Sequence, residues 1–208
     1  MIVAVDGPAA AGKGTLARAL AKHYNFHFLD TGSLYRMVGL AVMVRSRDPR
    51  DVEAARAAAI SLKPHLIREQ DLRTEKVGEA ASIVAANPGV REALLGFQRD
   101  FAKRPPGTVL DGRDIGTVVC PEANAKVYVT ARPDVRAKRR YHEYLARAEA
   151  VTYEAILADI LKRDERDASR GSAPMRPAAD ADLLDTSDLD IEAAFDAAVG
   201  LIKRKIGQ

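Results

Sequence analysis

The feature that most constrains the fold is a glycine-rich loop near the start of the chain. Residues 2–5 form a short apolar run, which the segment Gly7-Pro8-Ala9-Ala10-Ala11-Gly12-Lys13-Gly14-Thr15 follows almost directly. The spacing is G-x-x-x-x-G-K, and an Ala- and Leu-rich helical segment begins at the lysine. Small residues let backbone N–H groups surround phosphate oxygens, and the helix N-terminus adds partial positive charge. The loop therefore predicts a nucleoside triphosphate site in which Lys13 reaches the β- and γ-phosphates; a glycine-rich turn without a ligand is the alternative.

One residue of the loop departs from the strict motif. That motif has Ser or Thr directly after the lysine, whereas Gly14 stands here between Lys13 and Thr15. The G-K-G-T form resembles that of nucleoside monophosphate kinases, in which magnesium is held mostly through water and nucleotide oxygens. We therefore assign no protein ligand to the metal. The Asn-Lys-x-Asp signature with which GTPase switches read guanine is absent, which argues against that class.

Short apolar runs alternate with helical segments along the chain. We predict strands at residues 2–5, 26–29, 108–110, 126–130 and 183–184. The predicted helices lie at residues 13–23, 33–45, 51–62, 75–86, from about 89 to 102, and at 133–148, 153–167 and 191–206. This alternation is typical of an α/β fold with a parallel central sheet and helices on both faces. We find no repeat or linker, so we expect residues 1–208 to form a single domain with small mobile appendages.

Composition and charge narrow the range of partners. The chain carries 32 Lys and Arg against 29 Asp and Glu, a net charge of +3. This balance is too even to favour nucleic acid, but it suits a pocket for small polyanions. Cys120 is the single cysteine, so we expect neither a disulfide nor a cysteine-based metal site, and a reducing compartment is favoured. The N-terminus lacks the pattern of a signal peptide and no run could span a bilayer, so we expect a cytoplasmic protein without membrane contact.

Two further segments place polar groups at predicted strand ends. Residues 29–36 (LDTGSLYR) put a hydroxyl, backbone groups and a guanidinium at the carboxyl edge of the sheet, where open α/β sheets bind ligands. In residues 110–117 (LDGRDIGT), Asp111 ends an apolar strand, as a carboxylate near magnesium does in a P-loop enzyme. An N-cap at residues 30–31 and a plain surface turn at residues 111–116 are the alternatives.

A cationic stripe follows near residue 165. Arg163, Arg166, Asp167 and Arg170 are spaced 3, 1 and 3 apart, so on a helix they share an arc of about 100°. Apolar residues at 156, 157, 160 and 161 precede them, and a Gly-, Ser- and Pro-containing loop at residues 170–177 follows. We interpret residues from about 149 to 177 as a lid that closes over phosphates and excludes water. A solvated charged face is the alternative.

Together these segments resemble bacterial cytidylate kinases. The colinear motifs are GPAAAGKGT, LDTGSLYR, AASIVAANPGVREALL, LDGRDIGTVV and RDERDASR followed by PAADADLLDTS, and they cover nearly the whole chain. DTGxxYR and DGRDxGT are specific to that family among kinases. The resemblance implies a P-loop kinase fold and transfer of the γ-phosphoryl group of ATP to CMP, and to dCMP as well, giving ADP and CDP or dCDP. It also implies a monomer and Mg²⁺ as the companion of ATP, with Asp111 expected near the metal.

The resemblance also implies roles for individual residues. The residues expected to bind ATP are Gly7, Pro8, Ala9, Ala10, Ala11, Gly12, Lys13, Gly14, Thr15, Arg136 and Arg140. Those expected to hold the CMP phosphate are Arg36, Arg113 and Arg170, those expected to meet the cytosine are Ser82, Arg91 and Asp114, and those expected on the ribose side are Arg163 and Asp167, with Thr31 against the acceptor. The expected catalytic residues are Lys13, Arg163, Arg170 and Arg113. Without the resemblance, Arg136 and Arg140 would be interpreted as a solvated helix face.

One region departs from the family. Residues 31–107 would form the acceptor-binding region, where many bacterial members carry a small three-stranded insert. Such an insert needs about twenty residues, but only residues 62–75 lie between the flanking helices, so we predict that it is trimmed to a loop. Two other functions stay open: a small-metabolite kinase on the same fold, such as a shikimate-type enzyme, and a nucleotide-binding regulatory module with little turnover.

Overall fold

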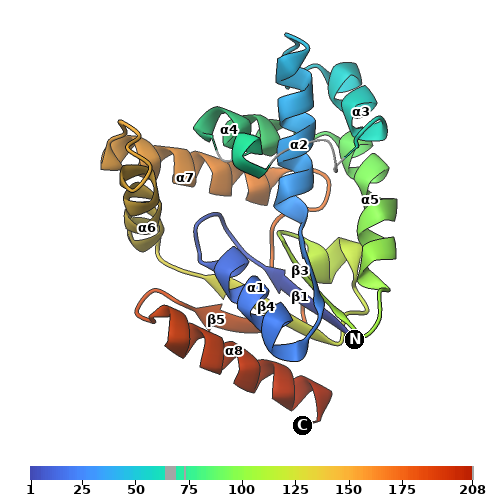
Figure 1. Ribbon diagram of the computed structural model, residues 1–208, viewed down its shortest axis with the longest axis vertical. Helices are drawn as coiled ribbons and strands as arrows, with labels where there is room; N and C mark the ends of the chain where they lie inside the picture. Colours follow the sequence, from blue (N-terminus) through green and yellow to red (C-terminus); the bar gives the residue numbers. More distant parts are fainter. Residues whose placement is uncertain (64–68, 73, 208) are drawn as a thin grey trace.

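The centre of the molecule is a parallel sheet, as the alternating pattern predicts. The computed structural model describes residues 1–63, 69–72 and 74–207 (Figure 1). Its five strands are β1 (Ile2–Asp6), β2 (His27–Asp30), β3 (Thr108–Gly112), β4 (Ala125–Thr130) and β5 (Asp182–Asp185). They pair in the order β2-β3-β1-β4-β5, and every pair is parallel. The predicted α/β fold of P-loop kinases is thereby confirmed, with β1 at the centre.

Helices connect consecutive strands. They are α1 (Lys13–Tyr24), α2 (Thr31–Val44), α3 (Val52–Ile60), α4 (Glu75–Val84), α5 (Pro88–Ala102), α6 (Pro133–Leu145), α7 (Tyr153–Ser169) and α8 (Ile191–Ile206), with a short 3₁₀ helix, η2 (Glu69–Leu72), and a π-helical turn, η3 (Ile115–Val119). All eight α-helices were predicted, most of them to within a few residues. The turn η3 has no counterpart in the sequence prediction.

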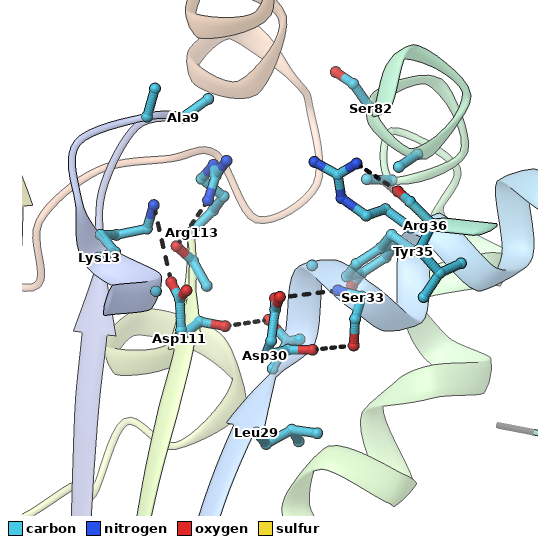
Figure 2. Close-up of a pocket in the computed structure, with 18 of the residues that line it drawn as sticks. Ala9, Lys13, Leu29, Asp30, Ser33, Tyr35, Arg36, Ser82, Asp111 and Arg113 are labelled. Carbon is cyan, nitrogen blue, oxygen red and sulfur yellow. Dashed lines mark hydrogen bonds and ion pairs between the residues drawn. The ribbon is translucent and has the colours of Figure 1, made fainter. Parts of the chain in front are cut away.

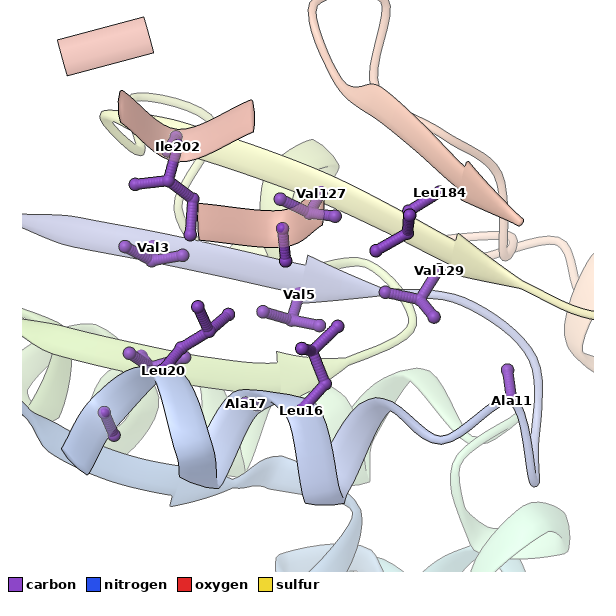
Figure 3. Close-up of a cluster of buried hydrophobic side chains, with 14 residues drawn as sticks. Val3, Val5, Ala11, Leu16, Ala17, Leu20, Val127, Val129, Leu184 and Ile202 are labelled. Atoms are coloured by element: carbon purple, nitrogen blue, oxygen red, sulfur yellow. The ribbon is translucent and has the colours of Figure 1, made fainter. Parts of the chain in front are cut away.

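The main hydrophobic core lies between the sheet and the helices α1 and α8 (Figure 3). Val3 and Val5 of β1 pack there with Leu16, Leu20 and Ile202, all nearly or fully buried. The intervening residues of β1 and β3 point to the other face, where α5 and η3 cover them. Because both faces are covered, β1 is apolar at every position until it ends at an aspartate.

Two smaller helical layers extend beyond the carboxyl edge of the sheet. The helices α2, α3, α4 and α5 share one cluster, built around Val38, Val84 and Val90. The helices α6 and α7 share another, on the opposite side of the molecule in Figure 1, in which Tyr144 packs with two isoleucines of α7. The predicted apolar band of α7 is narrower than expected, because Leu161 is 48% exposed.

The predicted trimming of the insert at residues 62–75 lies in part outside the described residues, which omit 64–68 and 73. The described part contains η2, which brings buried Leu72 against α2.

In the described part of the chain, no helix is both long and apolar enough to cross a membrane.

Candidate active site

A cavity of about 1040 Å³ opens at the carboxyl ends of β2 and β3, beside the loop that follows β1. Its lining includes most of the predicted site residues: Ala9, Ala10, Gly12, Lys13, Gly14, Thr15, Thr31, Arg36, Ser82, Arg91, Arg113, Asp114, Arg140, Arg163, Asp167 and Arg170. Gly7, Pro8, Ala11 and Arg136 lie outside this lining. The phosphate loop, the segments after β2 and β3, and α7 therefore face the same space, although they come from distant parts of the sequence.

Backbone conformation and close contacts favour glycine at three positions of the phosphate loop. Gly7 has φ 141°, and a Cβ there would lie 1.9 Å from the carbonyl oxygen of Val129. Gly12 has φ 88° and is the N-cap of α1. Gly14 stands where the strict motif has Ser or Thr, and a Cβ at Gly14 would lie 3.3 Å from Oδ2 of Asp111. A side chain at position 14 would thus crowd the carboxylate of Asp111.

Lys13 and Asp111 form a buried pair at the base of the cavity (Figure 2). The Lys13 Nζ lies 3.8 Å from Oδ1 of Asp111 and donates a hydrogen bond to the Pro8 carbonyl oxygen at 2.8 Å. Burial lowers the pKa of Lys13 to about 8, helped by the nearby charge of Arg113 and opposed by Asp111. Burial raises the pKa of Asp111 to about 6 in spite of the neighbouring lysine. The pKa of each group is therefore shifted toward neutral pH, downward for Lys13 and upward for Asp111.

Asp111 is the carboxylate best placed to meet a metal that accompanies ATP. Its Oδ1 has no hydrogen-bond partner among the described residues. These residues contain no group of three or more His, Cys, Asp or Glu side chains that could hold a metal. One free carboxylate oxygen fits Mg²⁺, which proteins often bind through one or two carboxylates together with water and substrate phosphates.

The segment after β2 both caps a helix and lines the cavity, which are the two interpretations considered from the sequence. Asp30 is the N-cap of α2, because its side chain accepts a hydrogen bond from the Ser33 N–H at 3.1 Å. It also lines the cavity. The Thr31 hydroxyl donates to the Asp111 carbonyl oxygen at 2.7 Å and so ties α2 to β3. Arg36, one turn into α2, points across the cavity and donates to the Leu72 carbonyl oxygen at 2.9 Å.

Three arginines crowd one wall of the cavity. A Cβ placed on Gly78 would have guanidinium nitrogens of Arg36, Arg163 and Arg140 as its nearest neighbours, at 3.4, 3.7 and 3.8 Å. Burial and repulsion from Arg140 and Arg113 lower the pKa of Arg163 to about 10, and burial and Arg140 also lower that of Arg36. The Arg163 Nε has no hydrogen-bond partner among the described residues. Buried like charges of this kind favour an anion between them.

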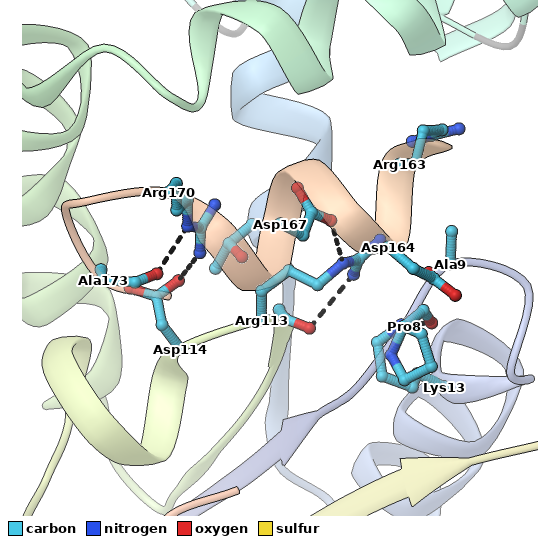
Figure 4. Close-up of polar contacts among 12 residues, drawn as sticks. Pro8, Ala9, Lys13, Arg113, Asp114, Arg163, Asp164, Asp167, Arg170 and Ala173 are labelled. Atoms are coloured by element: carbon cyan, nitrogen blue, oxygen red, sulfur yellow. Dashed lines mark hydrogen bonds and ion pairs between the residues drawn. The ribbon is translucent and has the colours of Figure 1, made fainter. Parts of the chain in front are cut away.

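A second group of arginines is paired with acids (Figure 4). Arg113 donates from Nε to Asp167 at 3.1 Å, which joins β3 to α7. Asp114 pairs with Arg91 and, at 3.5 Å, with Arg170. The predicted helical face is correct for Arg163 and Asp167, but α7 ends at Ser169 and Arg170 follows it in an extended conformation. Arg170 therefore reaches Asp114 from the loop rather than from the helix.

Arg136, expected beside ATP, has a different environment from Arg140. It is 3% exposed and donates to the carbonyl oxygens of Ala131 and Ala9 at 2.8 and 3.1 Å. Its two terminal nitrogens contact both carboxylate oxygens of Asp164, at 3.1 and 2.5 Å. Arg136 is buried and Arg140 lines the cavity, so neither arginine belongs to a solvated helix face. Arg136 instead connects the phosphate loop to α7.

Three residues of this site were missed from the sequence. Asp6 accepts hydrogen bonds from the turn after Asp114, and Asp164 holds Arg136. The ring of Tyr35 lies under Arg91, with its centroid 5.7 Å from the guanidinium carbon. Asp6 carried a usable signal, since it ends an apolar strand as Asp111 does. Asp164 carried none, because it is one acid in a segment of alternating charges.

A parallel sheet with a phosphate loop after its first strand, and a cavity rich in arginines beyond that loop, defines a P-loop kinase whose acceptor is itself anionic. The Cytidylate kinase family model matches residues 3–204. A cytidylate kinase of Bradyrhizobium diazoefficiens is 57% identical over 203 residues, which are 98% of this chain and 96% of that protein. One of Caulobacter sp. is 56% identical over 202 residues, 97% and 94% of the two chains. This chain belongs to the cytidylate kinase family.

Solved structures support the fold alone. An uncharacterized protein from Eubacterium ventriosum has a TM-score of 0.60 at 17% identity, covering 98% of each chain. Shikimate kinase from Bacteroides thetaiotaomicron has a TM-score of 0.51 at 14% identity, covering 100% of this chain and 99% of that one. Such identities carry no information about the acceptor.

Proposed function

We propose that this protein transfers the γ-phosphoryl group of ATP to CMP, and to dCMP, giving ADP and CDP or dCDP. The observation that supports this most is the arrangement of the cavity, in which Lys13 of the phosphate loop and the arginines of the acceptor side face one space. A regulatory module would need one anion site, whereas two phosphate-bearing substrates need two. The family relationship names cytidine nucleotides as the substrate class.

The acceptor side would bind CMP through charge and through the base edge. Arg36, Arg113 and Arg170 would hold the phosphate, since a guanidinium binds phosphate oxygens with two parallel hydrogen bonds. Ser82 supports a base contact, because its buried Oγ lines the cavity and has no partner among the described residues. Asp114 would accept a hydrogen bond from the cytosine amino group, where uracil presents an oxygen instead.

Phosphoryl transfer would proceed by positioning and charge neutralisation, without a covalent enzyme intermediate. Lys13 would neutralise the β- and γ-phosphates, while Arg163, Arg113 and Arg170 stabilise charge on the group in transit and on the acceptor. Mg²⁺, when bound with ATP near Asp111, would supply further charge neutralisation at the phosphates. The excess of arginine charge along the cavity supports this, because an anionic transition state relieves the repulsion between these charges.

Residues from about 149 to 177 would act as a lid, and residues 31–107 as the acceptor-binding region. The lid proposal is supported by the contacts of α7, which packs on α6 through a small apolar cluster and is joined to the cavity wall by its charge pairs with Arg113 and Arg136. Arg163 and Asp167 would meet the ribose side of the acceptor. A monomer, a cytoplasmic location and the lack of nucleic-acid partners stay predictions from the sequence.

A coupled assay that measures ADP release tests the proposal. The purified protein is given ATP and Mg²⁺ with CMP, dCMP, UMP, AMP or shikimate in turn, and the Lys13→Ala variant serves as the inactive control. We expect kcat/KM to be highest for CMP or dCMP and undetectable for shikimate. Preference for shikimate would show a small-metabolite kinase instead, and turnover with none of the acceptors would contradict the proposed reaction.

A further inference from the structure

Asp6 is a buried carboxylate that the proposed reaction leaves without a role. It is the last residue of β1, directly before Gly7, and is 6% exposed. Its Oδ1 accepts a hydrogen bond from the backbone N–H of Ile115, and its Oδ2 accepts one from that of Gly116, both at 2.7 Å. The two oxygens therefore bind neighbouring donors that lie 109 and 110 residues further along the chain.

These two donors open the π-helical turn η3. The first N–H groups of a helix have no partner inside it. Asp114 occupies the N-cap position of η3, but its side chain makes no capping bond. Asp6 supplies the missing acceptors from another strand, and hydrogen bonds to a carboxylate are stronger than those between neutral groups. The start of η3 is thus fixed to the end of β1.

The position of η3 matters because it begins directly after two acceptor-side residues. Asp114 pairs with Arg91 and Arg170, and Arg113 pairs with Asp167. The same aspartate immediately precedes the phosphate loop, so one side chain joins the backbone of the donor site to that of the acceptor site. The strand pairing agrees with this, since Asp6 lies opposite Gly112 in the register of β1 and β3.

Burying a carboxylate at this position costs free energy, so Asp6 does more than fill space. Burial raises the pKa of Asp6 to about 6, and only the two backbone hydrogen bonds oppose the effect strongly. No ion pair of Asp6 is found within the described ranges. Two N–H donors at this spacing need two acceptor oxygens, however, and an asparagine offers one acceptor and an NH₂ group that would face a donor. The geometry therefore requires the carboxylate.

We infer that Asp6 is a positioning residue for phosphoryl transfer, which fixes the Arg113–Asp114 segment relative to the phosphate loop and so sets the distance between acceptor and ATP. The inference rests on the proposed function. Transfer between two bound groups is sensitive to that distance, because a displacement of about 1 Å can lower the rate by about a hundredfold.

The test compares Asp6→Asn with Gly116→Ala and Thr108→Val. Gly116→Ala leaves Asp6 intact but adds a Cβ 3.4 Å from its Oδ2 and 3.1 Å from Lys126 Cδ, which crowds the turn against both side chains. Thr108→Val is the matched control, because it removes a buried hydrogen bond to Ala102 at the opposite end of β3. For each folded variant, kcat and KM are measured for both substrates, ATP affinity is measured by calorimetry without CMP, and unfolding is followed in urea.

We expect Asp6→Asn and Gly116→Ala to lower kcat at least about tenfold and to raise KM for CMP several-fold, while ATP affinity changes by less than about threefold. Thr108→Val should lose stability and keep both KM values. If Asp6→Asn does not fold, Gly116→Ala alone must show this pattern. The inference is overturned if kcat and KM for CMP stay near wild type in the folded variants, or if ATP affinity falls as much as CMP affinity. Wild-type protein inactive on CMP would instead refute the proposed function, so the two failures are distinct.

Discussion

Arg163 offers a direct test of the charge repulsion among the arginines of the cavity. Its side chain is nearly buried, its nearest acid is Asp159 at 3.7 Å, and Arg140 and Arg113 lie close to it. The pKa of Arg163 is lowered to about 10. Each pKa unit corresponds to about 1.4 kcal/mol, so the charged guanidinium is disfavoured at this position by about 3 kcal/mol. Arg163→Met keeps most of the side-chain length and removes the charge.

We expect Arg163→Met to be more stable than the wild type without nucleotides, by about 1–3 kcal/mol, and to be nearly inactive. The lowered pKa already contains the opposing contribution of Asp159, and the lower limit allows for imperfect packing of the methionine. Urea unfolding followed by circular dichroism gives the free energy, provided that the dependence on urea concentration stays the same. Lys162→Met is the matched control, since Lys162 is exposed and its pair with Glu79 at 3.7 Å is a surface contact. Its stability should stay within about 0.5 kcal/mol.

An Arg163→Met protein as stable as the wild type, or less stable, would refute this reasoning. The charged guanidinium would then not destabilise the folded enzyme in the absence of nucleotides. A stable but inactive variant would show that the site keeps a destabilising group for its function.

Three further predictions follow from contacts across the cavity. Asp114→Ala should narrow the ratio of kcat/KM for CMP over UMP by about ten- to hundredfold, the value of one base-edge contact; a constant ratio would place base choice elsewhere. Asp164→Asn should lower the free energy of unfolding by about 2–4 kcal/mol in urea, since it leaves the buried Arg136 partly unpaired, and an unchanged value would remove that pair as a structural link. Hydrogen exchange over residues 163–170 should slow when ATP and CMP analogues bind together, and equal exchange in the free and bound states would contradict the lid.

The sheet and its helices could be predicted because local pattern determines them. The strand β1 is buried on both faces, and its sequence is therefore a continuous apolar run. The helix α8 was predicted with the bounds that it has, Ile191–Ile206. The phosphate loop could be predicted because its glycines serve local backbone geometry. Resemblance then placed the acceptor residues, which the cavity brings together.

The parts that could not be predicted depend on contacts distant in sequence. The first N–H groups of the turn η3 are bound by Asp6, and no pattern within residues 115–119 indicates an acceptor on another strand. Arg136 and Arg140 look equivalent in the sequence, but neighbouring segments decide that one binds the phosphate-loop backbone and the other faces the cavity. The loop at residues 170–177 was predicted, but the ion pair that Arg170 makes with Asp114 joins segments too distant in sequence for a local pattern to show.

The pKa of Lys13, lowered to about 8, predicts opposite effects of pH on activity and on stability. Above pH 8 the free enzyme loses the charge that attracts phosphates, so kcat/KM for ATP, which reports the free enzyme, should fall. At saturating ATP the bound phosphates raise this pKa, so kcat should persist to higher pH. For stability the folded pKa lies below the unfolded value of 10.5, so the unfolded chain binds more protons from pH 8 to 10.5 and the Lys13 contribution to stability rises there. Lys13→Met, which should be nearly inactive, should remove the rise in stability with pH, and a wild-type kcat/KM for ATP that stays level to pH 9.5 would contradict the argument.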